Sequence, residues 1–597
     1  MIYSGISHYA DQRDAFFLED GRLRIRIATS RGDMSAIYLH TQDKYIGLDR
    51  ADTRACYKMH RYASDFGHDY FSADIDIPMA GQFKKNPDML CLRYFFEMVD
   101  EAGARIWYGD SRFFSGEPGD VEAMYDCPLI SRREQTFRVP GWAKNAVVYQ
   151  IFPTRFATTE KVDDKLWYKA PIAWDDDLKG NLQGIIRHLP YLKELGVDVI
   201  YMTPIFRSNT SHKYDTIDYY AVDPSLGDSN DLHELVDKAH AAGMRVMLDG
   251  VFNHTSPDFF AFKDVVKNGR ASKYYNWYYL DSDDVSFGSH TSKPSFQSFA
   301  YVGFMPKLNL SNPETASYVI DVACHYIKDF GIDGWRLDVA DEIGHSFWKK
   351  FRRAVKAVNP DALLVGEIWH FSPDFLQGDE WDSVMNYAFY KNIGSMLCDG
   401  NLSPSGFLSQ QGFLNGVYHS AVLPVMWNLI DSHDTSRFLW RAGGDKRKLS
   451  LAAAFQMLTP GTPFIYYGDE VAMTGGDDPD NRRGMLWDEE LQDLDMYHWY
   501  QRLTFFRHTI NALTAGSYSS VSADDDKCLL EYHLSSGEVL IFHTADGETN
   551  ALEYKGYKEL LSDKVFNGTI PGYGCVLLRK SVVRKYRHFH QNANMIE

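Results

Sequence analysis

The sequence predicts an α/β protein built on a (β/α)8 TIM barrel, with one antiparallel β-sandwich before the barrel and another after it. Three observations predict this architecture. Short alternating strands fill roughly the first 125 residues, apolar runs then alternate with helical patterns from Ala146, and short alternating strands return after about residue 508. A chain of 597 residues is long enough for several hydrophobic cores.

Residues 1–125 are expected to form the N-terminal β-sandwich. The runs Leu23-Arg-Ile-Arg-Ile-Ala-Thr29 and Ala36-Ile-Tyr-Leu-His40 alternate apolar and polar residues, and the turn Arg31-Gly-Asp33 separates them. This alternation is typical of antiparallel strands with one buried face. The cluster Val139-Pro-Gly-Trp142 interrupts the pattern and indicates the passage to the barrel, which we place in residues 126–508.

Eight apolar runs are predicted barrel strands, because each has the length of a strand and helical patterns separate them. They are Val147–Phe152, Val197–Met202, Arg245–Asp249, Ile332–Asp338, Leu363–Glu367, Ser383–Asn386, Val425–Ile430 and Pro463–Tyr467. One predicted helix spans Leu182 to Leu195 and ends at Gly196, and another begins at Ser311-Asn-Pro-Glu314 with a cap and a proline.

The interval of roughly fifty residues between His254 and Met305 is too long for an ordinary loop and predicts a small subdomain, residues 255–305, on the third barrel loop. Its aromatic run Tyr274–Tyr279 is either a wall of a sugar-binding cleft or the core of the subdomain. Residues 509–585 are expected to form the C-terminal β-sandwich, and residues 586–597 a tail.

The charge balance and the absence of long apolar runs exclude several classes of partner. Lys+Arg 62 against Asp+Glu 81 gives a net charge of −19, which repels nucleic acid and anionic lipid. No apolar run approaches the ~20 residues that span a membrane. The segment Met1–His8 has neither the basic nor the apolar region of a secretory signal, so a cytoplasmic location is expected.

Acidic residues follow four of the predicted strands, at the barrel face where catalytic residues gather. The third strand leads into Asp249 and His254, the fourth ends at Asp338, the fifth at Glu367, and the seventh leads into Asp434. A single acidic residue after a strand more often caps the next helix. Four of them at one rim favour a shared site instead.

Hydrolysis of an acetal requires one protonated carboxyl group and one carboxylate near the reacting carbon. Arg336 lies two residues before Asp338, on the same strand face, and is expected to keep Asp338 ionised as the nucleophile. Glu367 follows an apolar strand, where desolvation favours the protonated form that a general acid needs. His254 and His433 are either donors to sugar hydroxyls or satisfied core residues.

Four motifs resemble the α-amylase family and occur in the family's order: Asp249-Gly-Val-Phe-Asn-His254, Gly334-Trp-Arg-Leu-Asp338, Gly366-Glu-Ile-Trp369 and Ser432-His-Asp434. The resemblance implies three catalytic residues, which are the nucleophile Asp338, the acid/base Glu367 and the transition-state stabiliser Asp434. It also implies substrate contacts from Arg336, His254 and His433, and from Tyr214, which would stack under the sugar being cleaved.

Further stretches resemble the branch that contains neopullulanase, cyclomaltodextrinase and maltogenic amylase. They are Met305-Pro-Lys-Leu-Asn309, Tyr467–Asp478 with Arg482, and Met485-Leu-Trp487. In this branch Asp478 and Arg482 would hold the sugar on the non-reducing side, whereas Trp369 and Glu342 would line the acceptor side. The branch carries an N-terminal β-sandwich that commonly covers the partner's cleft, which implies a homodimer.

The resemblance implies a retaining hydrolase of α-glucan oligosaccharides. The expected reaction cleaves α-1,4 bonds of cyclodextrins, maltodextrins or pullulan through a covalent glycosyl-enzyme intermediate, with transglycosylation as a second outcome. The alternatives are an α-1,6-glucosidase or glucan transferase of the same superfamily, and a non-catalytic glucan-binding protein. The three retained carboxylates argue against the last alternative.

The sequence departs from the family pattern in two places. Thr158-Thr-Glu160 and Lys179-Gly-Asn181 stand where calcium-binding members carry an Asn-Gly-Asp-like stretch and a Gly-Gly-Asp stretch, so no metal and no cofactor are assigned. Asp341-Glu342 stands where Asn-Glu is more usual, which leaves the linkage preference open.

Overall fold

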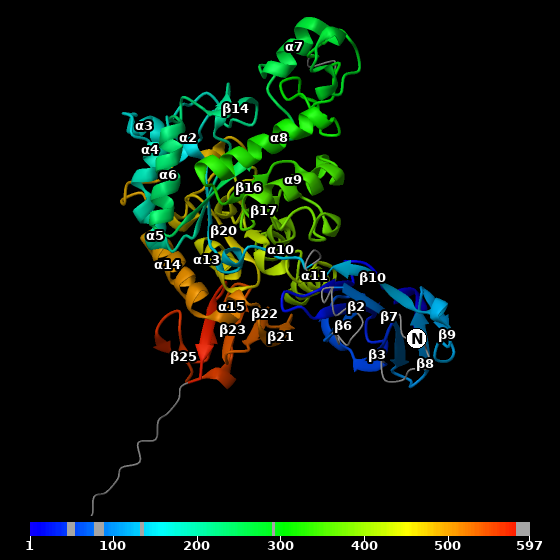
Figure 1. The fold of residues 1–597 in the computed structure, drawn as a ribbon. Coiled ribbons are helices and arrows are strands. Elements are labelled where there is room, and N and C mark those ends of the chain that lie inside the picture. The colour runs from blue at the N-terminus through cyan, green and yellow to red at the C-terminus, as the bar shows by residue number, and fades with distance from the viewer. Residues whose placement is uncertain (45–53, 77–88, 132–135, 289–292, 581–597) are drawn as a thin grey trace, which may run out of the picture.

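The computed structural model describes residues 1–44, 54–76, 89–131, 136–288 and 293–580. A parallel barrel forms the centre of the molecule (Figure 1). The N-terminal and C-terminal antiparallel sheets lie at one end of the barrel, and the insert that contains α7 projects from the other end (Figure 1). Within the described ranges, the helices are too short or too polar to cross a membrane.

The predicted eight-stranded barrel is confirmed, and its strands follow one another in chain order. Strand β20 pairs with β11, and a parallel bridge between Met385 and Trp427 joins the remaining edges, so the sheet closes on itself. The strands are β11 (Val148–Ile151), β12 (Val199–Met202), β15 (Arg245–Gly250), β16 (Gly334–Leu337), β17 (Leu363–Gly366), β18 (Ser383–Val384), β19 (Trp427–Leu429) and β20 (Thr462–Tyr466).

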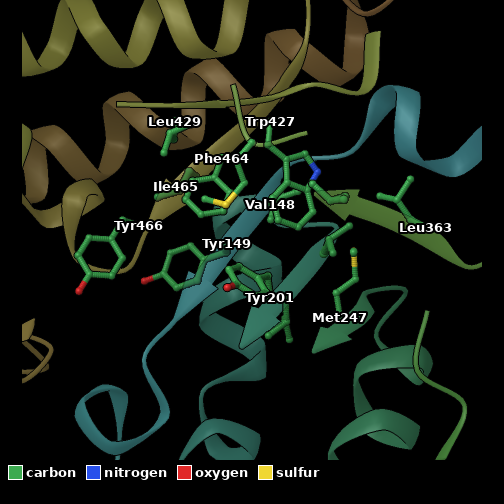
Figure 2. Close-up of a cluster of buried hydrophobic side chains, with 14 of the residues drawn as sticks. Val148, Tyr149, Tyr201, Met247, Leu363, Trp427, Leu429, Phe464, Ile465 and Tyr466 are labelled. Carbon is green, nitrogen blue, oxygen red and sulfur yellow. The ribbon is translucent and has the colours of Figure 1, made fainter. Parts of the chain in front are cut away.

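Large side chains fill the barrel interior. Figure 2 shows aromatic residues from several strands gathered together, among them Tyr201, Trp427 and Phe464. The ring centroids of Trp427 and Phe464 are 5.5 Å apart, and those of Tyr201 and Trp427 are 5.6 Å apart. The side chains labelled in Figure 2 come from β11, β12, β15, β17, β19 and β20. The barrel is therefore a packed support for the residues at its rim.

Helices surround the barrel in most of the connections between strands. They are α4 (Leu182–Arg187), α5 (Leu189–Leu195), α6 (Ser229–Ala241), α8 (Pro313–His325), α9 (His345–Val358), α10 (Tyr387–Leu397), α11 (Pro404–Val417), α13 (Lys446–Leu458) and α14 (Leu494–Thr509). The connection between β17 and β18 differs from the expected pattern, because it holds only the short 3-10 helix Pro373–Phe375.

The first predicted helix is two helices in the structure. It breaks at His188, because Pro190 lacks the N–H that would continue the hydrogen-bond ladder. Its predicted end is confirmed, since Gly196 adopts a left-handed φ of 89°. The predicted start of α8 is also confirmed, since the Asn312 side chain accepts hydrogen bonds from the first turn of the helix.

The N-terminal residues form the predicted pair of antiparallel sheets. One sheet has the order β1-β2-β6-β5, and the other the order β4-β3-β7-β8-β9, with β10 also pairing with β7. Strand β10 carries this sheet beyond residue 125, because it pairs with β7 as far as Ser131. The strands are β1 (Ala15–Phe17), β2 (Leu23–Ser30), β3 (Met34–Asp43), β4 (Ala55–Lys58), β5 (His60–Ser64), β6 (His68–Ile75), β7 (Met89–Asp100), β8 (Arg105–Gly109), β9 (Arg112–Phe114) and β10 (Tyr125–Ser131).

The predicted insert on the third barrel loop contains α7 (Phe260–Asn268) and short irregular pairings. Its aromatic run mainly forms a core, because Trp277 and Tyr278 are only 6% and 3% exposed. The ring of Tyr278 packs edge-on against Phe262 of α7. Of the two interpretations left open, the structure favours a core over a cleft wall for these two rings.

The C-terminal residues form a six-stranded antiparallel sheet and a separate two-stranded ribbon. The sheet begins after α15 (Asn511–Thr514), so helical structure extends past residue 509. Its strands are β21 (Tyr518–Asp524), β22 (Leu529–Leu534), β23 (Glu538–His543), β28 (Cys575–Arg579), β25 (Lys558–Glu559) and β26 (Lys564–Val565), and the ribbon pairs β24 (Thr549–Asn550) with β27 (Thr569–Ile570). The predicted tail 586–597 lies outside the described residues.

Helix α11 anchors the N-terminal sheets to the barrel. The Tyr62 hydroxyl donates a 3.0 Å hydrogen bond to the carbonyl of Gly416, and the Phe66 N–H donates one of 2.8 Å to Ser409 Oγ. Gly412 permits this close approach, because a Cβ atom there would overlap the carbonyl oxygen of Ser64.

We predict that Gly412→Ala weakens this contact and destabilises the protein by about 1–3 kcal/mol, because the added methyl group forces β5 away from α11. Thermal unfolding and limited proteolysis measure the effect. Gly119→Ala is the control, because a Cβ atom there meets nothing within 4 Å. A Gly412→Ala protein that melts like the unsubstituted protein would contradict the close contact.

Candidate active site

The ends of three neighbouring barrel strands meet at the side chain of Arg336. The register between β15 and β16 places Asp249 directly opposite Arg336. One guanidinium nitrogen, Nη1, lies 2.9 and 3.0 Å from the two carboxylate oxygens of Asp249 and 2.7 Å from Asp338 Oδ1. The other, Nη2, lies 2.8 Å from Glu367 Oε2. The predicted contact between Arg336 and Asp338 is confirmed.

A chain of polar contacts connects this cluster to Asp434. The Tyr214 hydroxyl donates to Asp249 Oδ2 over 2.9 Å and lies 2.5 Å from His433 Nε2. The same His433 nitrogen is 3.1 Å from Asp434 Oδ2. The structure therefore gathers Asp338, Glu367 and Asp434, the three predicted catalytic residues, around one network.

Gln150 determines which nitrogen of His433 carries the proton. Its side-chain amide donates to His433 Nδ1 over 2.7 Å, which leaves the proton on Nε2, facing Asp434 and Tyr214. Burial lowers the pKa of His433 well below its usual range, so the ring is neutral. His433 thus donates to this network as a neutral group.

The backbone after Asp338 is strained. Val339 has a φ of 45°, in the left-handed region that β-branched residues rarely adopt. Strain of this kind costs about 1–3 kcal/mol and persists where surrounding contacts hold it. Here the Val339 N–H donates a 3.1 Å hydrogen bond to Glu367 Oε2. The turn therefore couples the loop of Asp338 to the side chain of Glu367.

Burial disfavours the ionised forms of Asp338 and Asp249 in this cluster. Burial raises the pKa of Asp338 well above its usual range, and the charges of Glu367 and Asp249 add to this effect. Burial likewise raises the pKa of Asp249 to about 6. One guanidinium can offset only one of the three carboxylates in its immediate contact. Arg336 lowers the pKa of Asp338, as predicted, but burial and the other carboxylates oppose this effect and raise that pKa overall. The ionised state of Asp338 as the nucleophile stays a prediction.

His254 contacts the protein rather than an open cleft. It is 1% exposed, and its Nε2 donates to the carbonyl oxygen of Tyr214 over 3.1 Å. Burial lowers its pKa to about 3, so the ring is neutral. The structure favours the interpretation of His254 as a satisfied residue that positions Tyr214.

Of the two predicted acceptor-side residues, Trp369 lies beside Glu367, and Glu342 contacts Lys307 and Asn253. Trp369 Nε1 donates a 3.1 Å hydrogen bond to Glu367 Oε1, and its ring stacks on Tyr387 with centroids 4.0 Å apart. Glu342 follows β16 and accepts hydrogen bonds from Lys307 Nζ over 3.0 Å and Asn253 Nδ2 over 3.1 Å. Glu342 is thus held by protein contacts on the loop after Asp338.

The predicted non-reducing-side residues lie beside Asp434. Arg482 Nη2 is 3.3 Å from Asp434 Oδ1, and Arg482 Nε is 2.9 Å from Asp478 Oδ1. Arg482 Nε also donates a hydrogen bond to the His433 carbonyl over 2.8 Å. Burial raises the pKa of Asp478 to about 6, against the opposing charge of Arg482. Arg482 therefore links two carboxylates on this side of the cluster.

Sequence reasoning missed the positioning residues beneath the carboxylates. Asp249 holds both Arg336 and Tyr214, and Tyr201 donates a 2.6 Å hydrogen bond to Asp249 Oδ2. Asp249 had a visible sequence signal, because it is the first residue of a quoted motif at the end of a strand. Tyr201 and Gln150 look like ordinary strand residues, and no sequence signal distinguished them.

The stretches compared with the calcium-binding pattern do not fit a calcium ion. Lys179 Nζ lies 3.3 Å from Glu160 Oε2, and Asn181 Oδ1 accepts a 2.8 Å hydrogen bond from the Gly184 N–H as the cap of α4. Calcium requires six or more oxygen ligands. The positively charged Lys179 beside Glu160 supplies no such ligand and repels a cation. In the part of the chain that the structure describes, no group of three or more His, Cys, Asp or Glu side chains is arranged for a metal.

Two regions of the chain match known family models. Residues 150–514 match the family model of the alpha amylase catalytic domain, and residues 1–131 match that of the alpha amylase N-terminal ig-like domain. Neopullulanase 2 of Thermoactinomyces vulgaris is 40% identical over 88% of this chain and 87% of its own length. Cyclomaltodextrinase of Thermoanaerobacter pseudethanolicus is 40% identical over 88% of this chain and 89% of its own.

The fold comparison extends over nearly the whole chain. A solved structure named cyclomaltodextrinase has a TM-score of 0.89 and 33% sequence identity, and the alignment covers 97% of this chain and 100% of that one. The sandwich, barrel and C-terminal sheet therefore occur together in a known protein. By its matched domains and its relatives, the chain belongs to the α-amylase family and is a glycoside hydrolase of the cyclomaltodextrinase, neopullulanase and maltogenic amylase type.

Proposed function

We propose that the protein is a retaining hydrolase that cleaves α-1,4 bonds of cyclodextrins, maltodextrins or pullulan. The observation that carries this proposal is the shared contact of Asp338 and Glu367 with Arg336, at 2.7 and 2.8 Å. Two carboxyl groups on one guanidinium favour the separation of about 5–5.5 Å in retaining enzymes over the roughly 6.5–9.5 Å of inverting enzymes.

In the proposed reaction, Glu367 carries a proton and acts as the general acid. Glu367 gives this proton to the glycosidic oxygen while the Asp338 carboxylate attacks the anomeric carbon, and the leaving sugar departs with a new hydroxyl group. Glu367, now ionised, then removes a proton from a water molecule. The water oxygen attacks the anomeric carbon, and the bond between the glucan and Asp338 breaks. Asp434 accepts hydrogen bonds from the distorted sugar ring in both steps.

The proposed substrate contacts divide between the two sides of this centre. Tyr214 would stack under the sugar that is cleaved, with Arg336 and His433 around it, while His254 positions Tyr214 through the hydrogen bond to its carbonyl. Asp478 and Arg482 would hold the non-reducing side, because both lie beside Asp434. Trp369 and Glu342 would receive the acceptor. An acceptor sugar in place of water would give transglycosylation.

The names of the relatives support this substrate class. They include neopullulanase, cyclomaltodextrinase and maltogenic amylase at 35–40% identity. One relative at 36% identity is named intracellular maltogenic amylase. The homodimer and the cytoplasmic location expected from the sequence remain predictions.

Replacing Asp338 by Asn should reduce turnover of maltodextrins by about 10⁴-fold or more, because the amide cannot form the glycosyl intermediate. Circular dichroism should show an unchanged fold. The matched control is Asp374→Asn, an exposed residue on the connection after β17, which should retain activity. Normal turnover by the Asp338→Asn protein would refute the assignment of the nucleophile.

The first product should carry the α configuration at its new reducing end, because two displacements at one carbon restore the starting configuration. Proton NMR of the reaction within its first minutes distinguishes the anomers before they interconvert. An initial β-anomer would show a single displacement and an inverting mechanism.

Product analysis on cyclodextrin, pullulan, starch and maltodextrins ranks these four substrates by how readily the protein hydrolyses each of them.

Replacing Asp249 by Asn should move the acidic limb of the pH profile of kcat/KM to lower pH. The negative charge of Asp249 raises the pKa of its buried neighbour Asp338, which must be ionised to act as the nucleophile, so removing that charge lets Asp338 ionise at lower pH. Measuring kcat/KM for a maltodextrin from acidic to alkaline pH tests this sign. A limb that moves to higher pH would contradict the proposed coupling.

A further inference from the structure

Three of the thirteen tryptophans have exposed side chains, which are Trp174, Trp369 and Trp440. Trp369 is 37% exposed and lies on the proposed acceptor side. Trp174 and Trp440 are 54% and 55% exposed, and neither belongs to the site described above. An exposed indole ring contributes little packing energy to the folded protein, so packing alone does not explain the exposed tryptophans.

Trp174 lies against the non-reducing side of the site. The central guanidinium carbon of Arg482 is 5.7 Å from the centroid of the Trp174 ring. The loop that carries Trp174 is held in place, because the Ile172 N–H donates a 3.1 Å hydrogen bond to Asp480 Oδ1. Trp174 therefore continues the surface that Asp478 and Arg482 begin.

Trp440 contacts the loop that carries Asp478, formed by residues 475–482. It belongs to α12 (Phe438–Arg441), which follows the loop of Asp434. Gly476 lies against its ring, so that a Cβ atom on this glycine would be 3.4 Å from Trp440 Cε2. Trp174 and Trp440 thus both contact the segment that holds Asp478 and Arg482.

We propose that Trp174 and Trp440 form a further sugar-binding platform beyond Asp478 and Arg482. The platform takes the non-reducing end of longer linear α-glucans, whose C–H faces stack on flat indole rings. The inference rests on the proposed function, which places the non-reducing side at Asp478 and Arg482. Its consequence is a preference for long chains over short ones.

Binding of maltotriose and maltoheptaose tests the platform. Calorimetry in the Asp338→Asn background should show that Trp174→Ala or Trp440→Ala weakens maltoheptaose binding by about five- to tenfold, while maltotriose binding weakens less. Trp174→Phe should recover part of the loss, because it keeps a flat ring. Phe505→Ala removes another exposed aromatic side chain, on α14, and should leave both affinities unchanged.

Three results would overturn the platform. Equal effects on both sugars, or no effect on either, would mean that the rings do not contact the far end of a long chain. A change of sedimentation coefficient in the Trp174→Ala/Trp440→Ala protein would assign the rings to a subunit contact instead. Hydrolysis of maltoheptaose by the Asp338→Asn protein would count against the proposed nucleophile alone, so the two failures are distinguishable.

Discussion

The Arg336 guanidinium is fully buried, and it contacts the carboxylates of Asp249, Asp338 and Glu367. Burying three carboxylates without a cation would be prohibitively unfavourable, and a buried cation without partners would be equally so. The strands β15, β16 and β17 can therefore place these acidic side chains together only because the arginine lies between them. The pairing register of β16 with β15 and β17 keeps the arginine in that position.

Loops, rather than barrel strands, position Asp434 at the same site. Its loop follows β19, and the neighbouring segment after β20 holds it in place, since Asn481 Nδ2 donates hydrogen bonds to the carbonyls of His433 and Thr435, both at 2.8 Å. His433 and Tyr214 then connect the loop to Asp249. The position of the third carboxylate thus depends on loops, whereas the positions of the first two depend on strands.

The fold was largely predictable because its determinants are local. Apolar runs of strand length, helix caps and turn residues lie within short windows, and all eight barrel strands appear where their patterns predicted them. Local errors had local causes, since Pro190 divides one predicted helix. Strand β10 extends the N-terminal sheet because it pairs with β7, a partner more than thirty residues earlier that no local pattern reveals.

The sequence by itself determined the barrel, the acidic residues at its rim and the resemblance to a family. The tertiary structure alone decided how these groups interact. The contact of Tyr214 with His433 joins residues 219 positions apart, and the roles of Gln150 and Tyr201 exist only through such contacts. The raised pKa of Asp338 follows from burial and nearby charges, which chain order does not encode.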